Sequence, residues 1–128
     1  MRALLDTSCF LWFIAGSDRL SINARNFILD LNNELVLSAA SLWEIAIKVS
    51  LGKLDLLQSF EELITTQIES NAINLLPIEI KHLSTFIKLP FHHRDPFDRL
   101  IIAQGVTEGI PVISGDSVFQ KYNVEVIR

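Results

Sequence analysis

The sequence predicts an α/β fold, in which a central, mostly parallel sheet of about five strands is interleaved with helices. Two observations predict this class. Short apolar runs of β type alternate along the 128 residues with segments of helical periodicity, which is the pattern of a parallel sheet with crossover helices. The chain also contains no linker, repeat or low-complexity stretch, and its length suits a single domain covering residues 1–128.

The expected strands are short apolar runs that end in polar or turn-forming residues. The first run stops at Asp6, Thr7 and Ser8, and the second is apolar without a break, as in a strand that is buried on both faces. The five expected strands are residues 3–5, 35–37, 74–77, 112–113 and 124–126.

The segments between these runs have helical signals. The first and last helices end before Gly16 and Gly109, glycine being the residue type most common after helix C-termini. Ser21 is a suitable N-cap for the second helix, and Ile64 and Ile68 share one face of the fourth. The six expected helices are residues 10–15, 23–31, 41–49, 60–70, 78–87 and 97–108.

The composition limits where the protein works and what it contacts. The net charge of −4 and the pI near 5.3 count against a protein that coats nucleic acid by bulk electrostatics. The single cysteine, Cys9, rules out an internal disulfide and is expected to be a buried small hydrophobe. No signal-peptide pattern opens the sequence, and no apolar run reaches the roughly 18–20 residues that span a bilayer. We therefore expect a cytoplasmic protein.

A high apolar content predicts a protein partner. Hydrophobic residues make up 49% of the chain and the mean hydropathy is +0.34, which is high for a soluble monomer. Because no membrane span explains this excess, we expect apolar surface to meet another protein or a second copy of the chain.

Four acidic residues fall near expected strand ends or helix starts. Asp6 follows the first strand, and Asp116 follows the strand at residues 112–113. Glu44 lies in the helix after the second strand, and Asp98 opens the helix at 97–108. Loops and helix starts at strand ends are where open α/β sheets bind their ligands.

Each of the four also has a structural interpretation. Ser41 and Glu44 could form a capping box, and Asp98 falls in a first helical turn, where the dipole favours an anion. Asp116 could cap a short helix, and Asp6 could form an Asx-turn. Taken singly, these interpretations and the functional one are about equally strong, and it is their conjunction that favours a site.

If the four carboxylates converge in a partly dry site, they need a cation. Their mutual repulsion would otherwise raise their pKa values. Oxygen-only ligands suit Mg²⁺ or Mn²⁺ and not Zn²⁺. Such an ion, held by carboxylates, can generate hydroxide from water and stabilise the leaving oxygen in phosphodiester hydrolysis.

Four segments resemble, in order and spacing, the acidic motifs of PIN-domain proteins, and most of all those of the VapC-type toxins. These segments are residues 4–7 (LLDT), 41–45 (SLWEI), 95–104 (DPFDRLIIAQ) and 114–116 (SGD). The resemblance covers essentially the whole chain, and the third motif is its most specific part. It implies a three-layer α/β/α sandwich, dependence on Mg²⁺ or Mn²⁺, an RNA substrate, dimerisation and inhibition by a small antitoxin.

The same resemblance implies roles for individual residues. The catalytic metal ligands would be Asp6, Glu44, Asp98 and Asp116, and Ser114 would support the last of them. Asp95, which precedes Pro96, fits a helix N-cap better than a ligand.

Basic residues near the expected site have two interpretations each. Arg94 and Arg99 could contact a phosphate group of the substrate, although Arg99 could instead pair with Asp95 on the same helix. Lys48 could hold substrate, or could pair with Glu44 four residues before it.

The two adjacent histidines, His92 and His93, cannot easily face one ion together. We therefore expect them to lie at the surface or to support ligands from behind.

Three other functions are alternatives to the toxin that this resemblance implies. A phosphorelay receiver domain also gathers carboxylates around Mg²⁺, but Asp6 has no acidic neighbour and the last strand has no lysine after it. A catalytically silent PIN-like binding module is disfavoured by the presence of all four acidic residues. A PIN-like nuclease that processes RNA without an antitoxin is an alternative that the sequence leaves open.

Overall fold

The computed structural model describes all residues from Met1 to Arg128. The chain forms five strands, six α-helices and one 3-10 helix, η1. Their bounds are β1 Arg2–Leu5, α1 Thr7–Ala15, α2 Ile22–Leu29, β2 Glu34–Ser38, α3 Ala39–Ser50, α4 Phe60–Ser70, β3 Asn74–Leu76, α5 Ile80–Lys88, α6 Pro96–Glu108, β4 Val112–Ile113, η1 Ser117–Lys121 and β5 Val126–Ile127.

The five strands form one parallel sheet in the order β3-β2-β1-β4-β5. β1 lies at the centre, where Leu4 pairs with Val36 of β2 and with Val112 of β4. This order differs from the 2-1-3-4-5 order of the receiver fold. The structure therefore excludes the receiver interpretation.

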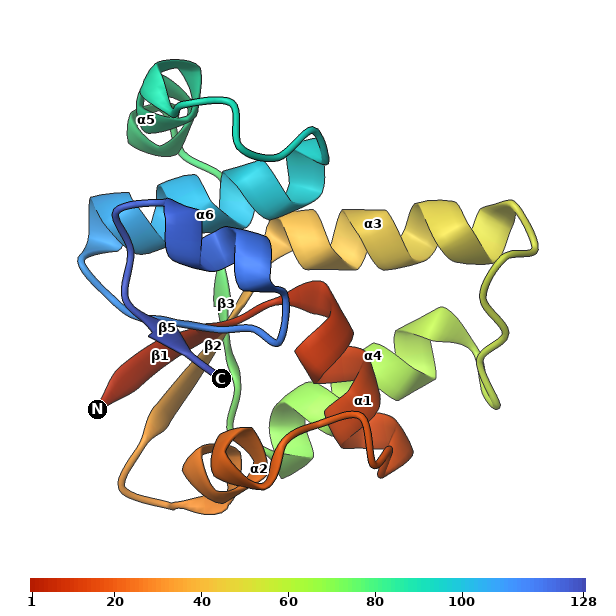
Figure 1. The fold of residues 1–128 in the computed structure, drawn as a ribbon. Coiled ribbons are helices and arrows are strands. Elements are labelled where there is room, and N and C mark those ends of the chain that lie inside the picture. The colour runs from red at the N-terminus through yellow and green to blue at the C-terminus, as the bar shows by residue number, and fades with distance from the viewer.

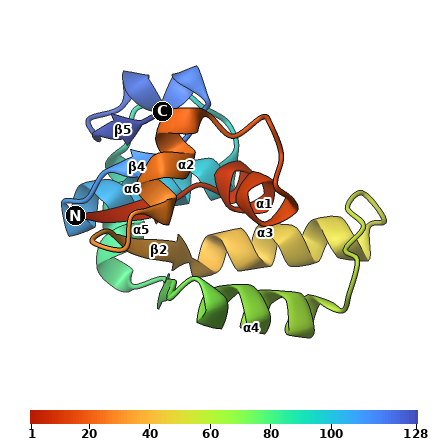
Figure 2. The same cartoon turned by 90° about the horizontal axis from the view of Figure 1, so that it is seen from below.

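Helices cover both faces of the sheet, so the expected three-layer sandwich is confirmed (Figures 1 and 2). Side chains that alternate along the strands divide the core in two. Leu5 and Leu37 pack toward the face of α1, α2 and α4. Leu4 and Val36 pack on the opposite face, with Ile102 of α6.

The observed elements follow the expected ones closely, with two informative shifts. α1 begins at Thr7, directly after Asp6, because that aspartate is its N-cap. α3 begins at Ala39, two residues before the expected start. Gly16 and Gly109 end α1 and α6 in left-handed backbone with φ of 64° and 67°, as their positions in the sequence predict.

No helix in the structure has both the length and the apolar character needed to cross a membrane.

Candidate active site

β1 and β4 are neighbours at the centre of the sheet, and the chain leaves them in opposite directions. From β1 it passes through α1 and α2 to β2 on one side, and from β4 through η1 to β5 on the other. A reversal of this kind opens a crevice outside the carboxyl ends of the strands, where α/β sheets bind ligands. Asp6 and Asp116 follow these two strands and so enter the crevice from adjacent positions.

Asp6 caps α1 and is buried in this crevice. Its Oδ1 accepts a hydrogen bond of 2.7 Å from the Cys9 backbone N–H, and only 4% of the residue is exposed. Burial raises the pKa of the Asp6 carboxyl, with a smaller contribution from the negative charge of Asp116, while hydrogen bonds from Ser114 and Cys9 oppose the increase. Asp6 therefore has a structural role that does not exclude a ligand role.

Asp116 caps η1 and remains half exposed. Its Oδ1 accepts a hydrogen bond of 3.0 Å from the Val118 N–H, and its own N–H donates to Ser114 Oγ at 3.1 Å. Because the buried Ser114 side chain also lies beside the Asp6 carboxylate, this serine connects the two aspartates.

Glu44 lies in the second turn of α3, so the capping box with Ser41, which was the structural alternative for this residue, does not form. The N-cap is Ser38, whose Oγ accepts a hydrogen bond of 3.0 Å from the Ala40 N–H. Ser41 is inside the helix, and its Oγ accepts a hydrogen bond of 2.9 Å from the Thr7 hydroxyl. This contact joins α1 to α3 and leaves Glu44 without any capping function.

The Glu44 carboxylate is buried and only partly satisfied. The residue is 7% exposed, and its Oε2 forms an ion pair of 3.0 Å with Lys48 Nζ. Its Oε1 is buried and accepts no hydrogen bond. Leaving a buried acceptor unpaired costs about 1–3 kcal/mol, and more for a charged group. An orphaned carboxylate oxygen of this kind marks a position where a cation or another ligand fits.

Asp98 is brought to the site by the cap of α6. The Asp95 Oδ1 accepts hydrogen bonds from the Phe97 N–H at 2.8 Å and from the Asp98 N–H at 3.3 Å, so the expected cap is confirmed. The Phe97 ring packs edge-on against Trp43, with centroids 5.2 Å apart, which holds the first turn of α6 against α3. Asp98 and Glu44 therefore come from two helices that are in contact.

The Asp98 carboxyl has the most perturbed environment of the four. Burial is the largest cause that raises its pKa, to about 7, and the negative charges of Asp95, Asp6 and Glu44 add to the increase. A hydrogen bond from His93 opposes it. The contacts between the elements agree with these effects, because Thr7, next to Asp6, contacts Ser41 of α3, and Phe97, next to Asp98, packs on Trp43 of the same helix.

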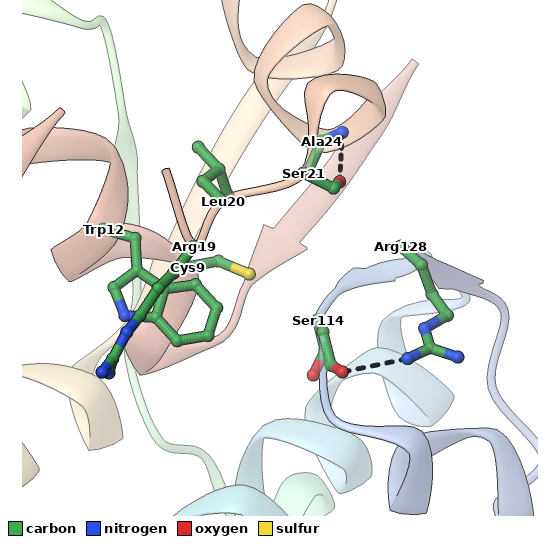
Figure 3. Close-up of a pocket in the computed structure, with 9 residues that line it drawn as sticks. Cys9, Trp12, Arg19, Leu20, Ser21, Ala24, Ser114 and Arg128 are labelled. Atoms are coloured by element: carbon green, nitrogen blue, oxygen red, sulfur yellow. Dashed lines mark hydrogen bonds between the residues drawn. The ribbon is translucent and has the colours of Figure 1, made fainter. Parts of the chain in front are cut away.

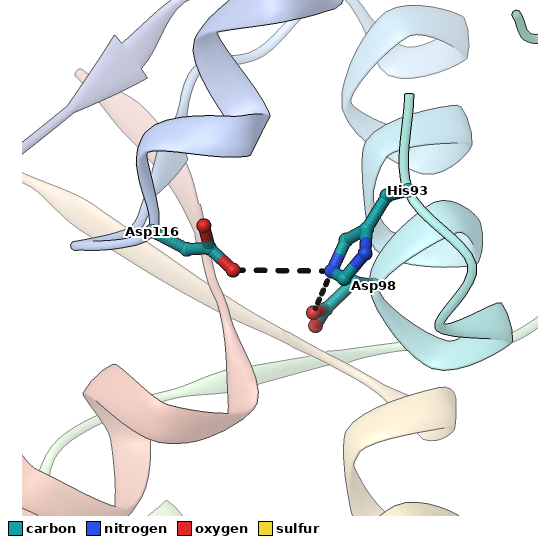
Figure 4. A group of neighbouring side chains, drawn as sticks. All are labelled: His93, Asp98 and Asp116. Atoms are coloured by element: carbon teal, nitrogen blue, oxygen red, sulfur yellow. Dashed lines mark hydrogen bonds and ion pairs between the residues drawn. The ribbon is translucent and has the colours of Figure 1, made fainter. Parts of the chain in front are cut away.

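His93 is the site residue whose position the sequence did not reveal. Its Nε2 lies 2.8 Å from Asp98 Oδ2 and 3.8 Å from Asp116 Oδ2, between the two carboxylates (Figure 4). Donor atoms of these three residues all lie within 4.8 Å of one another. The neighbouring His92 instead packs edge-on against Tyr122, at a centroid distance of 5.1 Å. His92 is exposed and His93 contacts the Asp98 carboxylate, so the two positions agree with the surface and supporting roles expected for these histidines.

The residues present fit a hard divalent cation. Four carboxylates from four parts of the chain share one crevice, one of their oxygens is buried without a donor, and Asp98 has a pKa raised to about 7. Lys48, which pairs with Glu44, is the only lysine or arginine that forms an ion pair with one of these four carboxylates. Oxygen donors with this excess of negative charge suit Mg²⁺ or Mn²⁺.

Two of the expected basic residues border the site. Arg94 and Lys48 line a shallow groove of about 380 Å³ together with Glu44 and Asp95. Arg94 is exposed, whereas Lys48 forms an ion pair with Glu44.

Arg99 does not border the site, and the expectation of a phosphate contact is wrong for it. The residue is only 2% exposed, and its guanidinium lies over the rings of Phe86 and Phe91, 5.0 and 4.1 Å from their centroids. Its Nη1 donates to the Pro90 carbonyl at 2.9 Å. Arg99 does not pair with Asp95 either, because the loop before α6 encloses it.

Cys9 can be set aside as a nucleophile. The thiol is buried, and this burial, with the adjacent Asp6 charge, raises its pKa far above the ordinary range. Because the thiolate is the reactive form, Cys9 is a packing residue, as expected.

Comparison with known proteins gives a family and a fold. The PIN domain family model matches residues 3–125. Among solved structures, the chain is similar to VapBC2 from Rickettsia felis bound to a promoter DNA fragment, with a TM-score of 0.73 and 16% identity over 98% of this chain and 97% of the other. It is also similar to FitAcB from Neisseria gonorrhoeae, with a TM-score of 0.67 and 17% identity over 98% and 96% of the two chains.

A third similar structure is VapBC-5 from Mycobacterium tuberculosis, a member of the VapBC family of toxin–antitoxin systems. Its TM-score is 0.62, and its 22% identity extends over 99% of this chain and 98% of the other. The comparison with curated proteins gave no match. At these identities the solved structures support the fold, while the family model matches nearly the whole sequence. The chain therefore belongs to the PIN domain family.

Proposed function

We propose that this protein is an endoribonuclease that uses Mg²⁺ or Mn²⁺ to hydrolyse RNA phosphodiester bonds, and that it acts as the toxin of a toxin–antitoxin pair. The observation that carries the nuclease is the convergence of four carboxylates with one buried oxygen left unpaired. Nuclease activity is the activity of PIN domains, and the crevice has the acidic residues that this chemistry needs.

In this proposal Asp6, Glu44, Asp98 and Asp116 hold the ion. When bound, the ion supplies a hydroxide nucleophile at neutral pH and neutralises the charge that develops on the leaving oxygen. The protein contributes orientation. The Cys9 N–H orients the Asp6 carboxylate. Lys48 Nζ orients the Glu44 carboxylate, and the Val118 N–H orients that of Asp116.

His93 positions Asp98 in this arrangement. The Arg94 N–H donates to His93 Nδ1 at 3.1 Å, so Nε2 carries the ring proton and donates to Asp98 Oδ2. Outer partners that orient a ligand in this way tune its affinity for metal. We assign His93 as a positioning residue, and no nucleophilic side chain is required.

RNA is the substrate that we propose, with Arg94 and Lys48 as phosphate contacts. Both line the groove beside Glu44 and Asp95, and Arg94 offers the planar fork of donors that suits phosphate. The groove is open enough for an extended strand, which favours single-stranded segments.

An antitoxin partner is supported by the similar structures, which are toxin–antitoxin complexes, and by exposed apolar surface. A groove of about 540 Å³ between α1, α4 and the segment before α4 is lined mainly by apolar side chains, including Leu11, Leu57 and Leu63. An apolar surface of this kind is suited to a partner segment.

A homodimer is supported by a second apolar surface on α5. Ile80, Leu83 and Ile87 are three and four residues apart and are 84%, 45% and 78% exposed. This spacing places them on one outward face of the helix. Light scattering should give the mass of two chains, and an Ile87→Glu variant should give the mass of one.

The test of the proposed function has two stages. The purified protein should cleave single-stranded RNA in Mn²⁺, lose this activity in EDTA and regain it when Mn²⁺ is restored. Expression in bacteria should then arrest growth, and co-expression of the small gene adjacent to its own should relieve the arrest. Cleavage without growth arrest would instead support a nuclease of RNA processing. Absence of cleavage with the metal bound would support a silent binding module.

A further inference from the structure

A cavity of about 220 Å³ lies directly beside the carboxylate cluster, between the α1–α2 region and the carboxyl ends of β4 and β5 (Figure 3). Two of its lining residues also form the wall of the acidic site. The Cys9 N–H donates to Asp6, and Ser114 Oγ accepts from the Asp116 N–H. A group bound in this cavity would therefore lie next to the proposed metal ligands.

Two cationic side chains line the cavity, and neither forms an ion pair within the protein. Arg19, from the loop between α1 and α2, and Arg128, which follows β5, both line it, and no Asp or Glu side chain does. Neither guanidinium lies within 4 Å of a carboxylate. Arg128 donates a hydrogen bond of 3.2 Å to the Gly115 carbonyl, which orients the side chain and leaves most of its donors free. Figure 3 shows Arg128 on one side of the open space and Arg19 on the other. The Arg19 guanidinium points away from Ser114, and this exposed side chain would turn inward to meet a ligand.

An RNA strand needs such a site in this protein. The chain has a net charge of −4, and an ion held by the four carboxylates can neutralise the phosphate that reacts but not its neighbours along the strand. A neighbouring phosphate therefore requires cationic side chains of the protein. Arginine is the residue type best suited to this, because its planar fork of donors matches phosphate oxygens.

We propose that this cavity binds the backbone phosphate next to the scissile one in a single-stranded RNA substrate, with Arg19 and Arg128 as its ligands. This inference rests on the nuclease function proposed above. The cavity adjoins Asp6 and Asp116, whereas the groove of Lys48 and Arg94 adjoins Glu44 and Asp95, and the two share no lining residue. The strand would cross the carboxylates from one basic site to the other. Trp12, which also lines the cavity, offers an aromatic surface to the adjoining sugar or base.

The experiment measures how RNA affinity depends on salt. A short, fluorescently labelled single-stranded RNA is titrated with the full chain in Mn²⁺, on an Asp98→Asn background so that the strand stays intact. Each phosphate contact to a single strand contributes about 0.7 to the slope of log K against log salt. Arg19→Gln and Arg128→Gln should each reduce the slope by about 0.7, and the double variant by the sum. Arg19→Lys, which keeps the charge, should retain the slope.

The matched control is Arg2→Gln. Arg2 lies at the amino end of β1, where it pairs with Glu34 at 3.6 Å, and its replacement removes the same charge at the far end of the sheet. Its slope should equal that of the unmodified background. Equal slopes in the Arg19, Arg128 and Arg2 variants would overturn the proposal.

Hydrolysis of the same RNA by the wild type is measured in parallel to separate this inference from the proposed function. Hydrolysis with no change of slope in the arginine variants would reject the phosphate site and keep the nuclease. A reduced slope in those variants without hydrolysis by the wild type would support the phosphate site and reject the nuclease.

Discussion

Two histidine–carboxylate pairs in this protein share a hydrogen-bond pattern and differ in their electrostatics. In each pair a backbone N–H donates to the histidine Nδ1, so that Nε2 faces a carboxylate as donor. His82 Nε2 lies 3.0 Å from Glu108 Oε2, and His93 Nε2 lies 2.8 Å from Asp98 Oδ2. The first pair lies between α5 and α6, and the second lies at the carboxyl edge of the sheet.

The neighbours of the two carboxylates account for the difference. Lys81 Nζ lies 2.9 Å from Glu108, and the hydrogen bonds from Lys81 and His82 lower the pKa of this carboxyl. Asp98 has no lysine or arginine within 4 Å, and burial and three acidic neighbours raise its pKa to about 7. The Glu108 cluster is complete as a structural ion pair, whereas the Asp98 cluster lacks a cation. The same local motif therefore forms a closed ion-pair cluster in one place and, in the function that we propose, supports a metal ligand in the other.

The largest expected difference between the two clusters is in catalysis. Asp98→Asn should reduce RNA hydrolysis by about a hundredfold or more, because a lost ligand removes several kcal/mol of charge stabilisation in the transition state. Glu108→Gln should retain most of the activity, because Glu108 forms ion pairs with Lys81 and His82 and with no residue of the candidate site. The two variants are compared by their initial rates of RNA hydrolysis in Mn²⁺, and far-UV circular dichroism verifies that both are folded. Equal losses in both variants would remove the distinction between the clusters.

The second expected difference is between the adjacent histidines. His93→Asn should weaken Mn²⁺ binding by roughly 10- to 100-fold, the usual effect of removing a residue that orients a metal ligand. His92→Asn is the matched control and should leave the affinity unchanged, since His92 contacts Tyr122 and no acidic site residue. Isothermal titration with Mn²⁺ measures both without reference to activity. A similar affinity in wild type and His93→Asn would reject the positioning role.

The third difference is in the pH dependence of stability without metal, where the two carboxylates act with opposite sign. Asp98 has a folded pKa of about 7, above its ordinary 3.8. The native state therefore binds more protons than the unfolded chain between these values, and its stability falls as the pH rises through this window. Asp98→Asn should flatten this fall in urea titrations made in EDTA.

Glu108 has a pKa below its ordinary 4.5. Its contribution is present above pH 4.5 and is lost as the pH falls through the folded value. Glu108→Gln should therefore reduce stability at neutral pH and much less in acid. A reduction that stays constant with pH would mean that the Glu108 charge does not stabilise the fold.

Much of the fold and of the site could be predicted because local signals decide it. Apolar runs and their polar ends locate the strands, and parallel strands bring their carboxyl ends to one edge. Asp6 and Asp116 follow from this rule alone. Asp98 follows from Asp95 and Pro96, which set the start of α6.

What the sequence did not reveal depends on contacts between distant segments. The Tyr122 hydroxyl accepts hydrogen bonds from the backbone N–H groups of His92 and His93 at 3.0 and 2.9 Å, and these bonds fix the loop that turns one histidine inward. Arg99 is enclosed by Phe86 and Phe91 of the preceding helix and loop, which an i, i+4 rule cannot indicate.

The N-cap of α3 was missed for a different reason. Ser38 ends β2 and caps the helix at once, so the strand and the helix have no loop between them. The pattern of apolar residues placed the cap at the next serine, Ser41, which instead contacts Thr7.

The most direct test of the account is whether Mn²⁺ stabilises the native protein through Asp6. Asp6→Asn keeps the N-cap of α1, because asparagine and aspartate cap equally well, but it removes one of the converging charges. Thermal melts of wild type, Asp6→Asn and Glu108→Gln are compared in EDTA and in Mn²⁺.

In EDTA, Asp6→Asn should melt above the wild type, because one repulsive charge is gone. Mn²⁺ at a hundredfold excess over Kd should stabilise wild type and Glu108→Gln alike, by about 2.7 kcal/mol, and Asp6→Asn much less. Equal Mn²⁺ shifts in all three proteins, or no shift in any, would contradict the account, because Asp6 would then be only the cap of α1 and the four carboxylates would not form a metal site.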